Sequence, residues 1–279
     1  MCSSDLVTAN APSTSVVTSG TVQVVVGTIT HNVPITNGLG SLIVNGPSTG
    51  TVTIVANFLG DSNHFNSPFD TENHEVEDTT SPDVQIIQAT AQDDPTNLSP
   101  IQFDVYFTEP VTGFTGSDVS FTGSTAPGTL VAAVTGSGDT YLVSVTGMTG
   151  SGTVIPTIPA NSAVDASNNG NNASFSNDNS VTYDITDPTV TINQAASQDD
   201  PTNQSPILFD VTFSESVTGL TGSDISFAGS TAPGTLVAAI SGSGTSYQVS
   251  VSGMTGSGSV VISLPADSVV DQAGNGNEA

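Results

Sequence analysis

The chain has 279 residues, with no Lys or Arg against 26 Asp plus Glu, and its formal net charge at pH 7 is −26. Phosphate clamps, arginine fingers and Schiff-base catalysis all need a cationic side chain, so they are excluded. Direct binding of nucleic acid is excluded and anionic membrane surfaces are disfavoured for the same reason. Hydrophobic residues form 35 % of the chain and come in short runs, which predicts three small cores and no membrane insertion.

The first segments of the chain stand apart from the rest. The opening run Met1–Leu6 contains the lone cysteine, Cys2, and resembles the translation of a sequencing-adapter oligonucleotide. Strand-like runs follow at Gly20–Val24 and Gly50–Phe58, and the turn Gly60–Phe65 comes after them. These motifs are similar to a bacterial Ig-like repeat that ends in a Gly-Asp-x-Asn-x-Phe turn. Residues 7–77 are therefore expected to form a partial Ig-like domain.

The remaining chain repeats itself. The run Asp93–Asn97 returns as Asp199–Asn203, and the run Gly147–Gly152 returns as Gly253–Gly258, in both cases 106 residues later. This period is longer than the roughly 20–50 residues of a solenoid repeat, so it indicates a whole small domain used twice. We call residues 78–184 repeat 1 and residues 185–279 repeat 2.

Each repeat has the pattern of β-strands. Apolar residues alternate with polar ones from Ile101 to Thr108, which is typical of a half-buried strand. No window shows helical periodicity with capping signals. Turn residues separate the other predicted strands, which are Val84–Gln88, Asp118–Thr122, Leu130–Thr135, Thr140–Thr146, Thr153–Ile158 and Ser180–Asp184.

Seven short strands in about 100 residues predict an immunoglobulin-like sandwich. The runs Phe103–Phe114, Gly116–Val119 and Asn169–Asn171, with Asp271–Asn275 in the second copy, resemble the bacterial Ig-like repeats of large surface proteins and adhesins. The fold class is therefore all-β, with tandem Ig-like β-sandwich domains. Repeat 2 stops at the equivalent of Ala173 and lacks the last strand, so we expect an exposed sheet edge and a fragment of a longer protein.

No catalytic arrangement is recognisable, and we expect no enzyme activity. The only histidines are His31, His64 and His74, all before the repeats, and their spacing matches no zinc pattern. The loop Asn168–Asn172 is interpreted as turn chemistry.

Carboxylates without counter-charges point to calcium, which takes 6–8 oxygen ligands. If successive strands alternate in direction, Glu109 at the end of its strand and Asp165 in the last loop face the preceding linker. Glu215 and Asp271 do the same in repeat 2. The alternative is that such residues cap turns and keep the surface soluble. The candidate calcium ligands at the domain junctions are Asp78, Asp83, Glu109, Asp165, Asp94, Asp184, Asp187, Glu215 and Asp271.

The resemblance implies a spacer segment of a secreted or cell-surface bacterial adhesin-like protein. Its expected partners are neighbouring Ig-like repeats, with cell-surface or polysaccharide ligands as a further option. The alternatives are a non-catalytic accessory region of a secreted polysaccharide-active enzyme and a weak carbohydrate-binding module. Grouping of Tyr106, Phe114 and Phe175 on one exposed patch would favour sugar binding.

Overall fold

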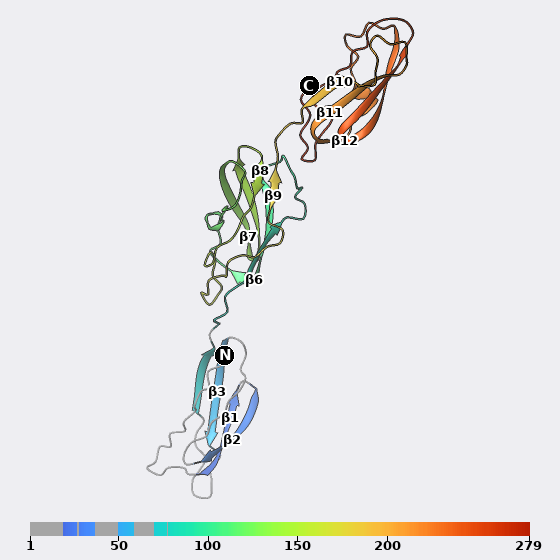
Figure 1. Ribbon diagram of the computed structural model, residues 1–279. Coiled ribbons are helices and arrows are strands. Elements are labelled where there is room, and N and C mark those ends of the chain that lie inside the picture. Colours follow the sequence, from blue (N-terminus) through green and yellow to red (C-terminus); the bar gives the residue numbers. More distant parts are fainter. Residues whose placement is uncertain (1–18, 27, 37–49, 59–69, 77) are drawn as a thin grey trace. The chain divides into compact units, whose positions relative to one another are not determined.

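The computed structural model describes residues 19–26, 28–36, 50–58, 70–76 and 78–279 (Figure 1). The chain divides into two compact units, residues 1–80 and 81–279. The opening run Met1–Leu6 and the turn Gly60–Phe65 lie outside the described residues.

The first unit contains a four-stranded antiparallel sheet. Its strands are β1 (Ser19–Val26), β2 (Ile29–Thr36), β3 (Gly50–Phe58) and β4 (Asp70–Val76), in the order β2-β1-β3-β4. Val22 and Val24 are buried while Gln23 between them is partly exposed, as the period of two along a strand requires. These residues form one face of the first unit's core.

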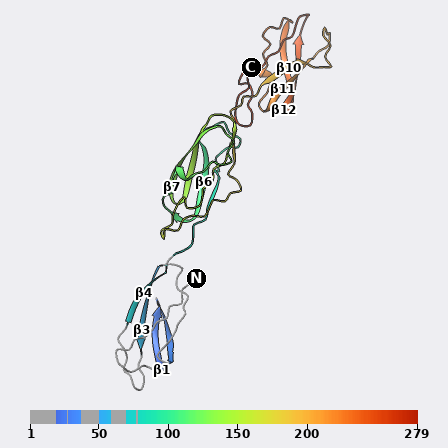
Figure 2. The same cartoon turned by 60° about the vertical axis from the view of Figure 1, so that its left-hand side comes forward.

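In the second unit, repeat 1 begins with the sheet β5-β6-β7, made of β5 (Val84–Gln88), β6 (Ile101–Val111) and β7 (Gly128–Met148). All pairs are antiparallel, and β6 lies beside β7 in both views (Figures 1 and 2). The odd-numbered residues of β6 from Ile101 to Phe107 are buried, which confirms the predicted alternation.

The element β7 is a hairpin. Gly136 and Gly138 have positive φ values of 114° and 74°, and the backbone of Gly147 lies directly against the carbonyl of Thr129. The two predicted strands Leu130–Thr135 and Thr140–Thr146 are the arms of this hairpin. A side chain at position 147 would collide with the opposite arm, so Gly is required there.

The second sheet of repeat 1 is shorter than predicted. It contains β8 (Gly152–Val154) paired with β9 (Val181–Tyr183), and a single β-bridge joins Ser120 to Thr157. The predicted start of a strand at Asp118 is wrong, because residues 116–118 form the 3-10 helix η1. The cause is local: the Asp118 carboxylate accepts a hydrogen bond from the Thr115 amide at 2.8 Å, which closes a capping box.

One hydrophobic core fills the space between the two sheets of repeat 1. Phe107, Phe114 and Tyr141 pack edge to face within it, with ring centroids 5.3–5.8 Å apart. Two antiparallel sheets around one core make a β-sandwich of the Ig-like type. The fold is therefore all-β, as the sequence predicts.

Repeat 2 follows the same plan. Its elements are β10 (Val190–Gln194), β11 (Ile207–Val217), the 3-10 helix η2 (Gly222–Asp224) and β12 (Gly234–Met254), each 106 residues after its counterpart. In the described part of the chain, the helical segments are these two short 3-10 turns, and none is long and apolar enough to cross a bilayer.

A buried tyrosine in the second arm of β7 is hydrogen-bonded to the end of β6. The Tyr141 hydroxyl donates to the Val111 carbonyl at 2.9 Å, and burial raises the pKa of Tyr141. Tyr141→Phe should destabilise this domain by about 1–3 kcal/mol, because the buried carbonyl loses its partner. Scanning calorimetry of the full chain measures the change. Tyr106→Phe, at an exposed position, is the control, and an equal effect of both substitutions would contradict the assignment.

Candidate metal centre

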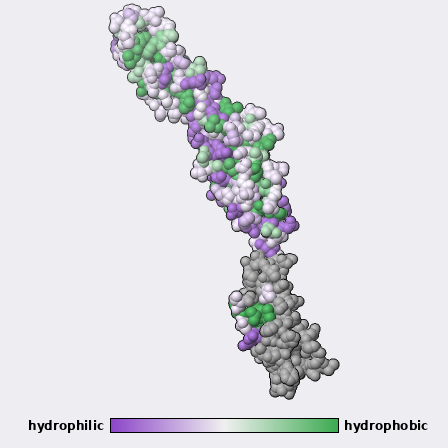
Figure 3. All heavy atoms as spheres, turned by 180° about the vertical axis from the view of Figure 1, so that it is seen from behind, coloured by the Kyte–Doolittle hydropathy of each residue, from purple (hydrophilic) through white to green (hydrophobic). Residues whose placement is uncertain are grey.

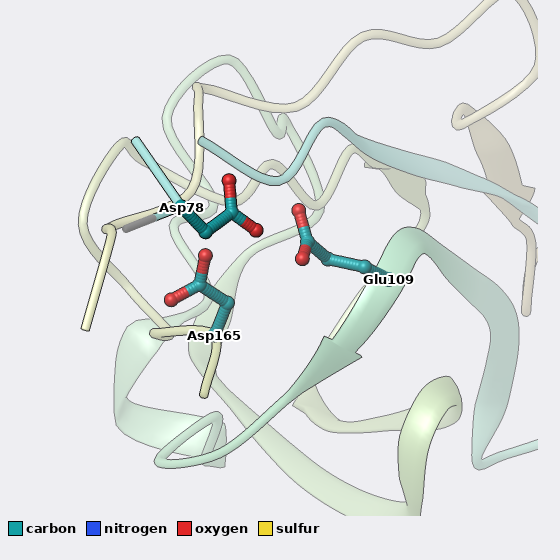
Figure 4. A group of neighbouring side chains, drawn as sticks. All are labelled: Asp78, Glu109 and Asp165. Carbon is teal, nitrogen blue, oxygen red and sulfur yellow. The ribbon is translucent and has the colours of Figure 1, made fainter. Parts of the chain in front are cut away.

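Two groups of three carboxylates recur in the structure, 106 residues apart. We call Asp184, Glu215 and Asp271 the downstream trio, and Asp78, Glu109 and Asp165 the upstream trio. Within each trio every residue offers one oxygen, and these oxygens lie within 4.8 Å of one another. Figure 4 shows the three carboxylates of the upstream trio pointing toward one another. The structure therefore brings together six of the nine candidate ligands.

The glutamate of each trio is placed by an irregularity in its strand. The register of β11 against β12 shifts between Thr212 and Val217, and the register of β6 against β7 shifts between Tyr106 and Val111. Glu215 and Glu109 lie inside these two stretches. A bulge bends a strand and changes the direction of its side chains, which explains why a glutamate at a strand end joins the loop carboxylates.

The last aspartate of each trio is held by its own turn. The Gly274 and Asn275 amides donate to Oδ1 of Asp271 at 2.7 and 2.8 Å, and the Asn275 side-chain amide donates to Oδ2 at 2.8 Å. Asp271 is only 6 % exposed. Each carboxylate oxygen has two acceptor sites, so Oδ2 keeps one site for a further partner. The turn therefore orients a buried carboxylate without using all its acceptor capacity.

Asp165 is held in the same way in the upstream trio. Its carboxylate accepts the Ser167 and Asn169 amides and the Asn169 side chain, each at 2.8 Å. Burial acts to raise the pKa of Asp165, but these hydrogen bonds outweigh it and the pKa is lowered. The turn thus keeps this carboxylate ionised.

Glu215 is in the opposite electrostatic situation. Burial raises its pKa first, and the negative charges of Asp184, Asp271 and Asp187 raise it further. No basic side chain exists in residues 81–279 to offset them. In the absence of a cation, the downstream trio therefore contains mutually repelling carboxylates.

Asp184 connects the downstream trio to both repeats. Its Oδ1 accepts the Ser151 hydroxyl at 2.9 Å and the Thr186 amide at 3.0 Å, and its carbonyl accepts the Asn275 side chain at 3.0 Å. Asn275 also accepts the Asn97 side-chain amide at 3.1 Å. Residues from the far end of repeat 1 and the near end of repeat 2 thus meet around this carboxylate.

The other three candidate ligands lie outside the trios. Asp83 accepts the Asn172 side-chain amide at 2.8 Å, and Asp94 accepts the Thr182 amide at 2.9 Å. Both hydrogen bonds are of the kind that the alternative interpretation expects, in which loop carboxylates stabilise turns and loops. Asp187 acts on Glu215 through its charge without joining the trio.

Sequence reasoning missed the polar residues that surround the trios. Asn169 and Asn275 each orient the aspartate four residues before them, while Asn97 and Ser151 reach across from repeat 1. The recurrence of Asp-x-x-x-Asn in both copies was a usable signal for the first pair. Asn97 and Ser151 have no such signal, because only the folded chain brings them to the junction.

Tyr106, Phe114 and Phe175 do not share one exposed patch, which is the arrangement that would favour sugar binding. Phe114 is in the core at 7 % exposure, whereas Tyr106 and Phe175 are 42 % and 59 % exposed. Both exposed rings flank Gln85, which pairs with Tyr106 on one side and bridges to Phe175 on the other. The loop Asn168–Asn172 uses its amides on its own surroundings, as in the Asn171 hydrogen bond to the Pro159 carbonyl at 3.0 Å.

The histidines offer no site in the described residues. His31 is a partly exposed residue of β2 and His74 lies in β4, while His64 falls outside the described residues. The carboxylate trios are therefore the groups with distinctive chemistry in the described part of the chain.

Comparison with known proteins gives a family-model match over repeat 2. Residues 184–279 match the family model of the bacterial Ig-like domain. Domains of this kind are typically non-catalytic and often extracellular. No curated protein and no solved structure matches the chain. The matched stretch begins at Asp184, so it includes the whole downstream trio.

The raised pKa of Glu215 predicts that Glu215→Gln changes the melting temperature in a pH-dependent way when EDTA removes metal ions. Because the pKa of Glu215 is higher in the folded state than in the unfolded state, the folded protein is favoured at low pH, where this carboxyl is protonated. That part of the stability is lost as the pH rises through the folded-state pKa. Glu215→Gln removes the charge, so it should raise the melting temperature of repeat 2 by roughly a few degrees at pH 7. The gain should vanish below about pH 4, where glutamate is protonated in both states.

Calorimetry of the full chain at several pH values measures this difference. Asp199→Asn is the matched control, since Asp199 is an exposed loop carboxylate outside the trios. If both variants change the melting temperature equally at pH 7, repulsion within the downstream trio is not the cause.

Proposed function

We propose that this chain is a structural spacer of an extracellular or cell-surface bacterial protein of the adhesin type, and that calcium bound by the carboxylate trios stiffens it. The bacterial Ig-like match of residues 184–279 supports the non-catalytic, extracellular setting. A series of sandwich domains is suited to holding a binding part of the protein at a distance and presenting it. The calcium proposal depends on the trios.

The observation that carries the proposal is the convergence of Asp184, Glu215 and Asp271 within 4.8 Å. All three side chains are at least partly buried, and like charges raise the pKa of Glu215. In a chain with no Lys or Arg, a bound cation is the available way to compensate such a group fully. Repulsion at this place therefore favours the uptake of a metal ion.

The donor set suits calcium. Each donor is a carboxylate oxygen, and residues 81–279 contain no His or Cys that would favour zinc. Oxygens bound to one calcium at 2.3–2.6 Å lie at most about 5 Å apart, which accommodates the separations in the trio. Backbone carbonyls and water would complete the 6–8 ligands.

An ion at the downstream trio would restrain the linker between the repeats. Asp184 belongs to the chain just after β9, whereas Glu215 and Asp271 belong to the body of repeat 2. Asp184 is also bonded to Ser151 of repeat 1. A cation shared by these residues would join the linker to the domain that follows it.

Calcium titration tests the binding. We expect heat on titration of the full chain with Ca²⁺ and a melting temperature that rises with Ca²⁺ and falls in excess EDTA. Saturation at about 100 times Kd corresponds to about 2.7 kcal/mol of stabilisation. Glu215→Gln should reduce the heat and the thermal shift, while Asp199→Asn should leave both unchanged. No heat and no shift at millimolar Ca²⁺ would remove the proposal.

Distance measurements test the stiffening separately. Ser137 and Ser243 are exposed residues in the hairpin turns of β7 and β12. Spin labels at Ser137→Cys and Ser243→Cys, in a Cys2→Ser background, report the spread of distances between the repeats. The distribution should narrow when Ca²⁺ replaces EDTA, and should stay broad in Glu215→Gln. Binding without narrowing would leave calcium as a ligand but contradict its stiffening role.

A further inference from the structure

The two repeats differ on the outer face of their first sheets, which points away from the core. Residues that pair directly across neighbouring strands have their side chains on the same face of the sheet. In repeat 1, Asp104 of β6 pairs with Ile87 of β5 on one side and with Leu142 of β7 on the other. All three residues are partly exposed. A carboxylate therefore lies between two apolar side chains at the surface of repeat 1.

Aromatic rings extend this surface along the sheet. Tyr106 is exposed and lies two residues after Asp104, on the same face of β6. Gln85 pairs with Tyr106, and the exposed Phe175 bridges to Gln85. Figure 3 shows apolar residues interrupting the polar surface of repeat 1. We call one group of residues the outer patch, and its members are Ile87, Asp104, Tyr106, Leu142 and Phe175.

The same face of repeat 2 is polar. Three apolar members of the outer patch have polar counterparts 106 positions later, which are Asn193, Thr212 and Gln248. The carboxylate is kept as Asp210, and it accepts the Gln248 side-chain amide at 3.2 Å. The inward apolar residues of β6, in contrast, are unchanged in β11. The sandwich therefore forms with a polar outer face, so folding does not require the apolar residues of the outer patch.

The chain offers no cation to the carboxylate of the outer patch. Residues 78–279 contain no Lys, Arg or His, and within them the Asp104 carboxylate has no hydrogen bond. A second copy of the chain would bring no Lys or Arg either. A protein segment that pairs with Asp104 must therefore come from a partner of different composition.

We propose that the outer patch binds a segment of a partner protein in which an arginine lies between two apolar residues on one face. The guanidinium pairs with the Asp104 carboxylate and stacks on the Tyr106 ring. The arginine stem and the flanking apolar residues cover Ile87, Leu142 and Phe175. The net charge of −26 also attracts a basic partner.

A cationic segment matches more of the outer patch than a sugar does. A neutral glycan can stack on Tyr106 and Phe175, but it leaves the charge of Asp104 uncompensated and the aliphatic side chains beside it uncovered. An arginine with apolar neighbours satisfies the carboxylate, the rings and the aliphatic side chains together. Charge complementarity therefore selects the basic apolar segment.

A capped peptide of sequence Leu-Ser-Arg-Ser-Leu tests the proposal, because alternate residues of an extended peptide lie on one face. In an NMR titration of the isotope-labelled full chain in EDTA, it should cause saturable shifts of the Asp104 and Tyr106 amide signals. The peptide Leu-Ser-Gln-Ser-Leu should bind about threefold more weakly or worse, because it lacks the charge. No saturable shift, or equal affinity for both peptides, overturns the proposal.

Repeat 2 supplies a matched variant of the whole patch. Ile87→Asn, Tyr106→Thr and Leu142→Gln together copy the outer face of repeat 2 onto repeat 1 and leave the net charge unchanged. This triple variant should keep its fold, which scanning calorimetry checks, and should bind the arginine peptide about tenfold more weakly. Undiminished binding would show attraction to the general negative charge and would overturn the assignment to the patch.

A single substitution tests the role of the carboxylate. Asp104→Asn, at a partly exposed position, should weaken binding of the arginine peptide about threefold and leave binding of the glutamine peptide unchanged. Equal losses for the two peptides would contradict pairing of arginine with Asp104.

A soluble oligosaccharide tests the competing occupant. Cellohexaose should leave the Tyr106 amide signal unshifted at concentrations at which the arginine peptide saturates. If cellohexaose shifts this signal and the arginine peptide does not, the outer patch is a glycan site and the proposal is wrong.

Discussion

The absence of Lys and Arg is the constraint on which the polar structure of this chain depends. Each carboxylate must be stabilised by water, by amide and hydroxyl donors, or by a metal ion. Asp118 and Asp224 are satisfied by capping boxes, Asp94 by a backbone amide, and Asp165 and Asp271 by tight turns. In the trios, which include Asp165 and Asp271, several carboxylates meet within 4.8 Å, and in the downstream trio burial and like charges raise the pKa of Glu215.

The alternation of apolar residues along strands and the alternating direction of the strands gave the most accurate predictions from the sequence. Val84–Gln88 was predicted with the observed bounds, because alternation along a strand is a direct consequence of which side chains are buried. Alternating strand direction also placed Glu215 and Asp271 at one end of the sandwich. The strand start predicted at Asp118 is wrong because of a local hydrogen bond. The capping box of Asp118 and the amide partners of Asp83 and Asp94 depend on backbone positions that residue patterns do not reveal.

The duplication acts as an internal comparison for the junction. The turn of repeat 1 has Asn168 at a positive φ of 66°, and repeat 2 has Gly274 there with a φ of 96°. A Cβ atom on Gly274 would lie 3.5 Å from the Asn97 side-chain nitrogen, which is an ordinary contact. Glycine is therefore not required to avoid a clash, and its advantage is the left-handed conformation. The close approach of Asn97 comes instead from its hydrogen bonds to Ala273 and Asn275.

One stretch of chain both completes the core of repeat 1 and supplies a carboxylate of the downstream trio. Tyr183, the last residue of β9, covers the core of repeat 1, and the next residue is Asp184 of the downstream trio. The Asp184 amide donates to the Thr96 carbonyl at 2.9 Å, so the end of β9 fixes the backbone that presents this carboxylate. A strand that pairs correctly in one repeat thereby positions a carboxylate beside the next repeat. The order of this junction then depends on the completeness of the preceding sandwich.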